Sequence, residues 1–110
     1  MASVTFQVQG SASEPYEVTF SRSGTNLTAS CTCPAGVVGQ YCKHRFNILD
    51  GVLDGIVSGN TSDVKTVAEW LKGTDVESAL HAVTGAEQEL ERAKKVAASA
   101  KKALARAMRD

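Results

Sequence analysis

Three cysteines and one histidine within fourteen residues constrain this chain more than any other feature of its sequence. They form two pairs, Cys31-Thr32-Cys33 and Cys42-Lys43-His44, separated by eight residues. A zinc ion takes four ligands at the corners of a tetrahedron, and thiolate and imidazole are preferred donors. In an extended segment the side chains of residues i and i+2 share one side, so both sulfurs of the first pair point the same way. The pattern predicts one structural Zn²⁺ held by Cys31, Cys33, Cys42 and His44.

Other interpretations of this cluster account for fewer of its residues. A disulfide would leave one cysteine unpaired, and a secreted disulfide framework usually has an even number of more widely spaced cysteines. A catalytic Cys–His pair would need an orienting group that the sequence does not single out. A closed four-ligand zinc site leaves no coordination position for water. We therefore expect a structural metal and no enzymatic activity.

Two basic residues, Lys43 and Arg45, flank the second ligand pair. Three thiolates, one imidazole and a divalent cation leave one net negative charge, which these side chains could offset. They could equally be solvated, or contact a phosphate, and the sequence leaves these alternatives open. A helix that begins near Cys42 would favour its thiolate through the partial positive charge of the helix N-terminus. We expect residues 34–41 to form the loop that joins the ligand pairs.

Apolar and polar residues alternate in the first thirty positions, which is typical of half-buried strands. The apolar members are Val4, Phe6 and Val8, then Tyr16, Val18 and Phe20, then Leu27 and Ala29. The polar run Gly10–Glu14 and the turn sequence Ser23-Gly24-Thr25-Asn26 separate the three runs. This pattern predicts a three-stranded antiparallel meander with one apolar face.

Helical spacing follows the cysteines. A first helix is expected through Phe46, Leu49, Val52, Leu53 and Ile56, with Gly59 near its end. A second short helix, capped by Thr61 or Ser62, carries Val64, Val67, Ala68 and Leu71 and ends at Gly73. Because aromatic residues are few, Trp70 and Phe46 are expected to be the bulky anchors of the core.

The last segment is rich in alanine and charge. Thr74 with Glu77 and Thr84 with Glu87 are both capping-box pairs. They predict either one helix from about residue 75, or a short helix followed by a long one from about residue 85. Apolar residues recur at alternating intervals of three and four, the pattern of a coiled-coil seam: Val76, Ala79, Val83, Ala86, Leu90, Ala93, Ala97, Ala100, Leu104 and Ala107. This seam predicts self-association, packing on the chain's own domain, or a free helix.

The charges of the chain are distributed unevenly, although they sum to zero. Residues 1–89 contain 5 Lys or Arg and 10 Asp or Glu, whereas residues 90–110 contain 7 and 2. Such an imbalance indicates an anionic partner for the tail, or a tail folded on an acidic body. The basic residues behind the seam are Arg92, Lys95, Lys102, Arg106 and Arg109. With Lys43 and Arg45, the first four are the candidate nucleic-acid contacts.

The N-terminal residues lack the basic and apolar regions of a secretory signal. No stretch of the sequence has the length and apolarity of a membrane span. We therefore expect a cytoplasmic protein with no membrane contact.

The motif Cys31-x-Cys33-Pro34, followed by Cys42-Lys43-His44, resembles the SWIM zinc finger, whose pattern is CxC, a variable gap and CxH. The preceding segment 16–20 and the following segment 46–49 also resemble the flanks of that family, so that the resemblance covers residues 15–57. It implies a β-hairpin joined to a helix through zinc, and a role in binding DNA or protein. Residues 58–110 lie outside it.

These observations together predict an α+β fold in three parts: a zinc-binding domain over residues 1–60, a short helix over 61–73, and a long basic helix over 74–110, a possible coiled coil. The predicted function is that of a nucleic-acid-binding accessory protein that contacts DNA or RNA. The alternative is a protein-interaction adaptor with purely structural zinc and no affinity for nucleic acid. A homodimer through the C-terminal helix is compatible with both.

Overall fold

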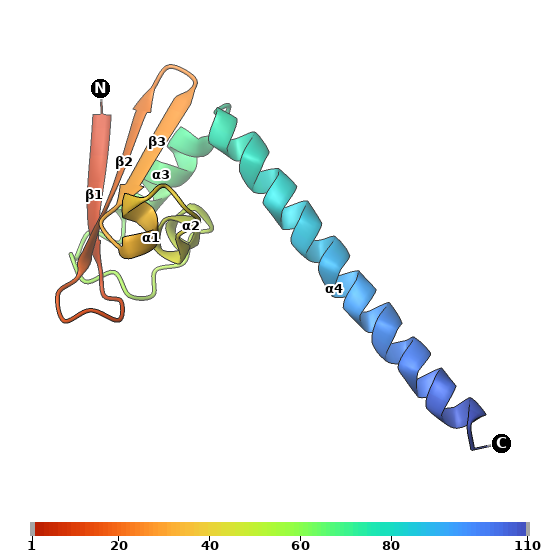
Figure 1. Ribbon diagram of the computed structural model, residues 1–110. Helices are drawn as coiled ribbons and strands as arrows, with labels where there is room; N and C mark the ends of the chain where they lie inside the picture. The colour runs from red at the N-terminus through yellow and green to blue at the C-terminus, as the bar shows by residue number, and fades with distance from the viewer. Residues whose placement is uncertain (1, 110) are drawn as a thin grey trace. The chain divides into compact units, whose positions relative to one another are not determined.

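The computed structural model describes residues 2–109 and begins with a three-stranded antiparallel sheet, followed by helices (Figure 1). The strands are β1 (Ala2–Val8), β2 (Tyr16–Ser23) and β3 (Asn26–Cys31). They pair in the order β1-β2-β3, with Phe6 opposite Val18 and Phe20 opposite Ala29. The predicted meander and the α+β class are confirmed.

The apolar face of the sheet forms the core. Phe6 and Phe20 are fully buried and meet edge to face, with ring centroids 6.2 Å apart. These two rings are the bulky anchors, so the expectation for Trp70 and Phe46 was wrong. Trp70 is partly buried at the margin of the core, and Phe46 stacks on Tyr41 at 4.3 Å. The alternation of apolar and polar residues in β1 and β2 places Phe6 and Phe20 on this face, because every second side chain of a strand points to the same side.

The helix expected from Phe46 to Ile56 is shorter than predicted. A turn of helix, α1 (Pro34–Val37), lies between the ligand pairs, and α2 (Lys43–Leu49) follows. Gly51 then adopts a positive φ of 81°, which glycine accepts without steric cost and which ends the helix.

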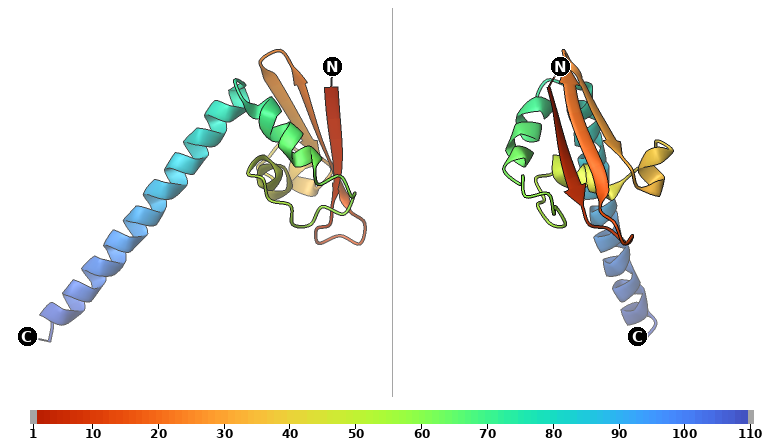
Figure 2. Two further views of the ribbon diagram at one scale, coloured as in Figure 1. Left: turned by 180° about the vertical axis from the view of Figure 1, so that it is seen from behind. Right: turned by 90° about the vertical axis from the view of Figure 1, so that its left-hand side faces the viewer.

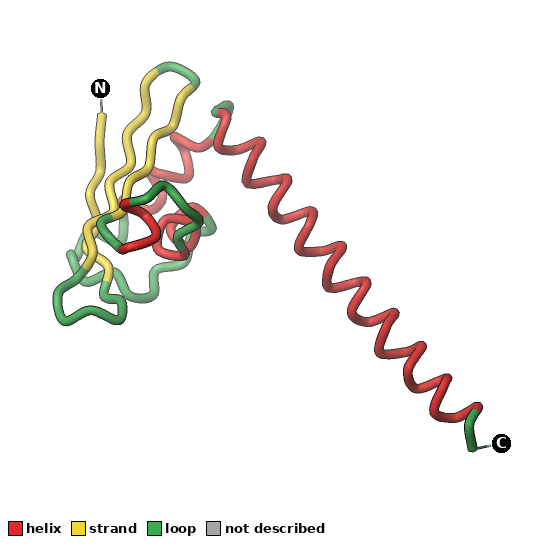
Figure 3. Tube along the Cα trace, in the orientation of Figure 1, coloured by secondary structure: helices red, strands yellow, loops and turns green. Residues whose placement is uncertain are grey.

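The segment after Gly51 is irregular (Figure 3) and pairs with the edge of β1. Ile56 forms a bridge with Val8, and the N–H of Val57 donates to the carbonyl of Gln7 at 2.8 Å. Hydrogen bonds to the strand edge thus replace the helical bonds that the apolar spacing of this segment predicted.

The predicted second short helix is confirmed as α3 (Asp63–Leu71), which runs along one face of the sheet (Figure 2). Ser62 is its N-cap, but the expected side-chain capping hydrogen bond does not form. It buries Val64 and Val67 in the core. Arg22 of β2 donates from Nη1 to the carbonyls of Trp70 at 2.9 Å and Lys72 at 3.1 Å. These carbonyls lack helical partners at the C-terminal end of α3, so the guanidinium fixes this end to the sheet.

The last helix, α4 (Asp75–Ala107), is a single helix of 33 residues. Thr74 accepts a hydrogen bond from the N–H of Glu77 at 3.3 Å, as its predicted capping role requires. The alternative start at Thr84 is wrong, because the surrounding alanine, leucine, glutamate and lysine residues favour continuous helix. The chain forms one compact unit up to Glu77 and a second from Ser78. Within residues 2–109, no helix is both long and apolar enough to cross a membrane.

Candidate metal centre

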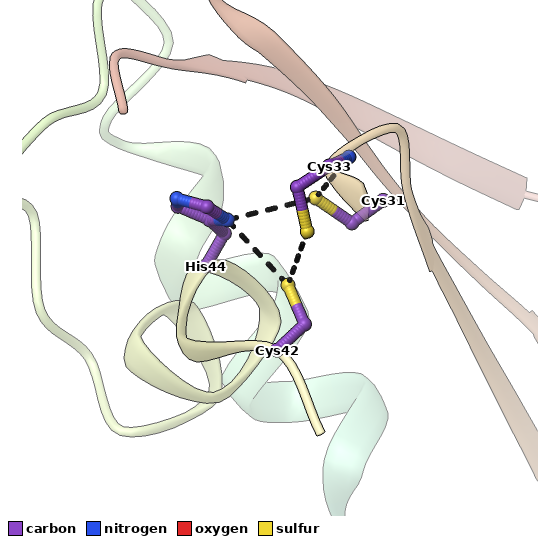
Figure 4. A group of neighbouring side chains, drawn as sticks. All are labelled: Cys31, Cys33, Cys42 and His44. Atoms are coloured by element: carbon purple, nitrogen blue, oxygen red, sulfur yellow. Dashed lines mark hydrogen bonds between the residues drawn. The ribbon is translucent and has the colours of Figure 1, made fainter. Parts of the chain in front are cut away.

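The four predicted ligands come together between the end of β3 and the start of α2 (Figure 4). Cys31 is the last residue of β3, Cys33 lies in the following turn, Cys42 is the N-cap of α2, and His44 lies in its first turn. The three cysteines are buried with free thiols, and His44 is partly buried. Their four ligand atoms all lie within 4.8 Å of one another.

The distances between these atoms lie near those of a tetrahedral metal site, although the largest of them, up to 4.8 Å, exceeds a tetrahedron edge. Zinc–sulfur bonds of about 2.3 Å and zinc–nitrogen bonds of about 2.0 Å give tetrahedron edges of about 3.5–3.8 Å. The sulfurs of Cys33 and Cys42 are 3.3 Å apart. Nδ1 of His44 lies 3.5 Å from the sulfur of Cys42 and 3.8 Å from that of Cys31. The four residues could therefore hold one metal ion with little rearrangement.

Backbone hydrogen bonds position the first ligand pair. Thr32 continues the pairing of β3 with β2, since its N–H donates to the carbonyl of Glu17 and its hydroxyl accepts from the N–H of the same residue. The chain then turns, and the N–H of Gly36 donates to the sulfur of Cys33 at 3.3 Å. The segment expected to be a loop therefore contains a helical turn, α1, capped by Cys33 itself.

Gly36 lets this turn pass close to β3. A Cβ atom at this position would lie 2.5 Å from the carbonyl oxygen of Cys31 and 2.8 Å from its Cβ. Both distances are shorter than van der Waals contact, so a side chain larger than hydrogen has no room here. The sequence places a glycine within the expected loop 34–41, but the close approach to Cys31 appears only in the structure.

The thiols of Cys31 and Cys42 have pKa values that are shifted in opposite directions. Burial raises the pKa of Cys31 to about 12. Burial also acts to raise the pKa of Cys42, but the backbone N–H of Arg45 and the side chains of Cys33, His44 and Cys31 outweigh it and lower this pKa to about 6. Cys42 is thus a thiolate at neutral pH, as its position at the start of α2 predicts.

His44 faces the sulfurs with Nδ1, which makes Nδ1 the candidate ligand atom (Figure 4). Its Nε2 is buried and has no hydrogen-bond partner among residues 2–109. The ring lies against Tyr16, with centroids 5.0 Å apart, and beside a cavity of about 350 Å³ that Gly10 and Asp54 also line. Sequence reasoning identified His44 as a candidate ligand but missed these neighbours, which are distant in the chain and match no spacing rule.

Lys43 and Arg45 differ in what they contact. The side chain of Lys43 is exposed. Arg45 is partly buried, and its guanidinium donates to the carbonyl of Ala29 at 3.3 Å and to the carbonyl of Gln40. It therefore fastens the end of the eight-residue spacer to β3 beside the ligands. These two hydrogen bonds to the backbone favour a structural role for Arg45 over a fully solvated side chain.

The other four predicted contact residues lie on α4, outside the unit that contains the ligands. Arg92, Lys95, Lys102 and Arg106 are all exposed. Their helix positions give them a common face, because residues separated by three, seven or eleven positions point in similar directions.

Comparison with known proteins gives no relative of this chain. No family model matches it, and neither does any curated protein or solved structure. The resemblance to the SWIM finger therefore stays a prediction based on the residues of the metal centre and their flanks.

Proposed function

We propose that this chain is a SWIM-type zinc-binding module that binds nucleic acid through the backbone phosphates. In this proposal Cys31, Cys33, Cys42 and His44 hold one structural Zn²⁺, and α4 supplies the phosphate contacts. The observation that carries the nucleic-acid role is a face of α4 that bears basic residues and no acidic ones.

The donor set supports zinc as the metal. Three thiolates and one imidazole are soft to intermediate donors, a set that suits tetrahedral zinc rather than magnesium or calcium, which prefer oxygen. With all four positions taken by protein, no position remains for water or substrate. The metal would therefore hold β3 and α2 together, and we assign it no catalytic step.

The basic face of α4 consists of nine residues that recur at intervals of three and four: Ser78, His81, Gly85, Gln88, Arg92, Lys95, Ser99, Lys102 and Arg106. Arg109, just beyond the end of α4, continues this spacing. None of them is Asp or Glu. Counting every residue of the segment from Arg92 to Arg109, on all sides of the helix, gives 7 Lys or Arg and no acidic residue. The charges from Arg92 to Arg106 extend over about 21 Å of helix. A straight row of cations of this length suits the regularly spaced phosphates of a nucleic-acid strand.

A salt-dependent titration of the full-length, zinc-loaded protein with DNA and RNA tests this proposal. Each phosphate contact contributes about 0.9 to the slope of log affinity against log salt for duplex DNA. Replacing Lys95, Lys102 and Arg106 with Gln should lower that slope by about 2–3 for every sequence alike.

A matched control changes the same net charge at Lys65, Lys72 and Lys101, which lie outside the basic face. This variant should keep most of the slope. Equal slopes for both triple variants, or no binding by the unmodified protein at about 50 mM salt, would refute the proposal, since phosphate binding is strong at low salt.

A second candidate is a protein-interaction adaptor, and the spacer between the ligand pairs favours it. Val37, Val38 and Tyr41 are 71%, 65% and 63% exposed. Apolar side chains gathered on a metal-fixed turn are suited to a protein contact. Under this alternative the titration detects no nucleic-acid binding at any salt concentration.

A further inference from the structure

An apolar stripe runs along α4 on the side opposite the basic face. In heptad notation its a positions are Val76, Val83, Leu90, Ala97 and Leu104, and its d positions are Ala79, Ala86, Ala93, Ala100 and Ala107. No residue of Asp75–Ala107 is buried. Leu90 and Leu104 are 56% and 60% exposed, which is unusual for leucine on a regular stripe.

We propose that this stripe pairs with the stripe of a second copy of the chain, with the two α4 helices antiparallel. The first argument is size. In an antiparallel pair each a residue faces a d residue of the other helix, whereas in a parallel pair a faces a and d faces d. Every d position here is alanine, and every a position except Ala97 is Val or Leu. Only the antiparallel arrangement therefore places a large side chain opposite a small one in nearly every layer.

A register follows from this rule. Aligning Leu90 with Ala93 of the second copy also aligns Val83 with Ala100, and Leu104 with Ala79. The same a-to-d pairing extends to both ends of α4, because intervals of three and four alternate along the whole stripe. Alanine at each d position lets the helices approach to the short end of the usual 8–10 Å range, so that Val and Leu fill the space. A parallel pair would alternate crowded Val or Leu layers with loosely packed alanine layers.

Charge gives an independent argument for the same direction. Residues 75–91 contain five Asp or Glu and no Lys or Arg, whereas residues 92–109 contain 7 Lys or Arg and no acid. Parallel helices would place like charges side by side along their whole length. Antiparallel helices place the acidic half of each against the basic half of the other, with Glu87 beside Lys94 at the flank of the stripe.

The basic face stays exposed in this dimer, because it lies opposite the stripe. Each α4 of 33 residues is about 50 Å long, so the two Thr74 residues, where the metal-binding units attach, would be about 50 Å apart. The dimer does not depend on nucleic-acid binding, and either proposal can fail without the other.

Light scattering of the full-length, zinc-loaded protein tests the pairing. We expect the mass of two chains at high micromolar concentration and of one chain for Leu90→Asp. A single chain for the unmodified protein throughout this range would overturn the proposal.

Charge exchange tests the direction. Lys94→Glu should weaken the dimer about tenfold, because it places two glutamates beside Glu87 residues. Lys95→Glu is the matched control, since it makes the same charge change behind the stripe and should leave the mass unchanged. The double variant Glu87→Lys with Lys94→Glu should recover the dimer. In a parallel pair Lys94 lies beside Glu89 instead, so failure of the double variant to recover would overturn the antiparallel direction.

Ala93→Leu provides a second, uncharged test. In the antiparallel register it crowds Leu90 of the other copy and weakens the dimer. In a parallel pair it fills an alanine layer and strengthens the dimer, so a gain in affinity would refute the proposal.

Discussion

The substitution Gly36→Ala tests whether the turn after Cys33 is built around the metal centre. The added Cβ would lie 2.5 Å from the carbonyl oxygen of Cys31 and 2.8 Å from its Cβ. The contact is with backbone, which cannot rotate away, so the turn must shift as a whole. Overpacking of this kind costs about 1–3 kcal/mol. The N–H of Gly36, which donates to the sulfur of Cys33, moves with it.

This cost should appear as weaker metal binding, because the shifted turn carries a ligand. A loss of about 1–3 kcal/mol corresponds to a zinc affinity about 5- to 150-fold lower. Competition between the protein and a chromophoric chelator measures this ratio directly. Gly85→Ala is the control: a Cβ there meets nothing within 4 Å, and alanine stabilises a helix interior by about 0.5–1 kcal/mol. Its zinc affinity should equal that of the unmodified protein.

The reasoning would be refuted if Gly36→Ala bound zinc within about twofold of the unmodified protein, a difference far below the expected packing cost. Such a result would mean that the turn moves freely, and that the close approach to Cys31 does not position Cys33. A loss of affinity in Gly85→Ala would show instead that the assay reports general stability.

Three further predictions concern the ligands. Purified protein should contain one zinc per chain by metal analysis, and Cys33→Ser or His44→Ala should abolish tight binding, because structural zinc requires its full ligand set. Zinc affinity should rise about tenfold or more per pH unit above pH 6, because binding displaces the proton that Cys31 holds up to a pKa of about 12; below about pH 6 it should fall more steeply, as Cys42 is protonated too. A pH-independent affinity would contradict this. Mild oxidation of the metal-free protein by diamide should link Cys33 to Cys42, whose sulfurs are 3.3 Å apart, and peptide mapping should find little of this disulfide when zinc is bound.

Local patterns were sufficient to predict the sheet and the cluster of three cysteines and one histidine that could hold a metal ion. Apolar residues that alternate with polar ones, as Phe6 and Val8 do, predict a half-buried strand. The cluster could be recognised because a tetrahedral metal ion would require these donor types in two closely spaced pairs, whatever the rest of the fold. Thr74 marked the start of α4 correctly because helix capping is also a local interaction, here with the N–H of Glu77 three residues on.

Features that depend on long-range contacts could not be predicted in this way. Ile56 falls at helical spacing from Phe46, yet it pairs with Val8 at the edge of β1. An apolar residue can be buried by a helix or beside a strand edge. Here α2 ends at Leu49, Gly51 adopts a positive φ, and hydrogen bonds to β1 hold the following segment. The carbonyls of Trp70 and Ala29, which accept hydrogen bonds from Arg22 and Arg45, are also distant in sequence, so no spacing rule indicates these contacts.

The final prediction follows from the overlap between the metal centre and the core. Cys31, Cys33 and Cys42 belong to the same buried cluster as Phe6 and Ile48, so removing the metal leaves thiols in place of a crosslink within the core. Structural zinc contributes on the order of 10 kcal/mol, comparable to the whole stability of a small domain. Chelation should therefore unfold the sheet and α2. The segment of α4 from Ala86 onward is entirely exposed and has no core contact to lose.

Hydrogen exchange and circular dichroism before and after chelation separate these regions. Amides of β2, β3 and α2 should lose their protection, whereas the helical signal of α4 should persist, because alanine-rich sequence and pairing with a second copy both sustain it. Leu90→Asp, which prevents pairing, shows how much of that signal depends on the dimer. Protection of α2 that survives chelation would mean that the apolar core holds this unit without metal. Loss of the α4 signal together with the sheet, in protein that is still dimeric, would show instead that α4 depends on the folded metal-binding unit.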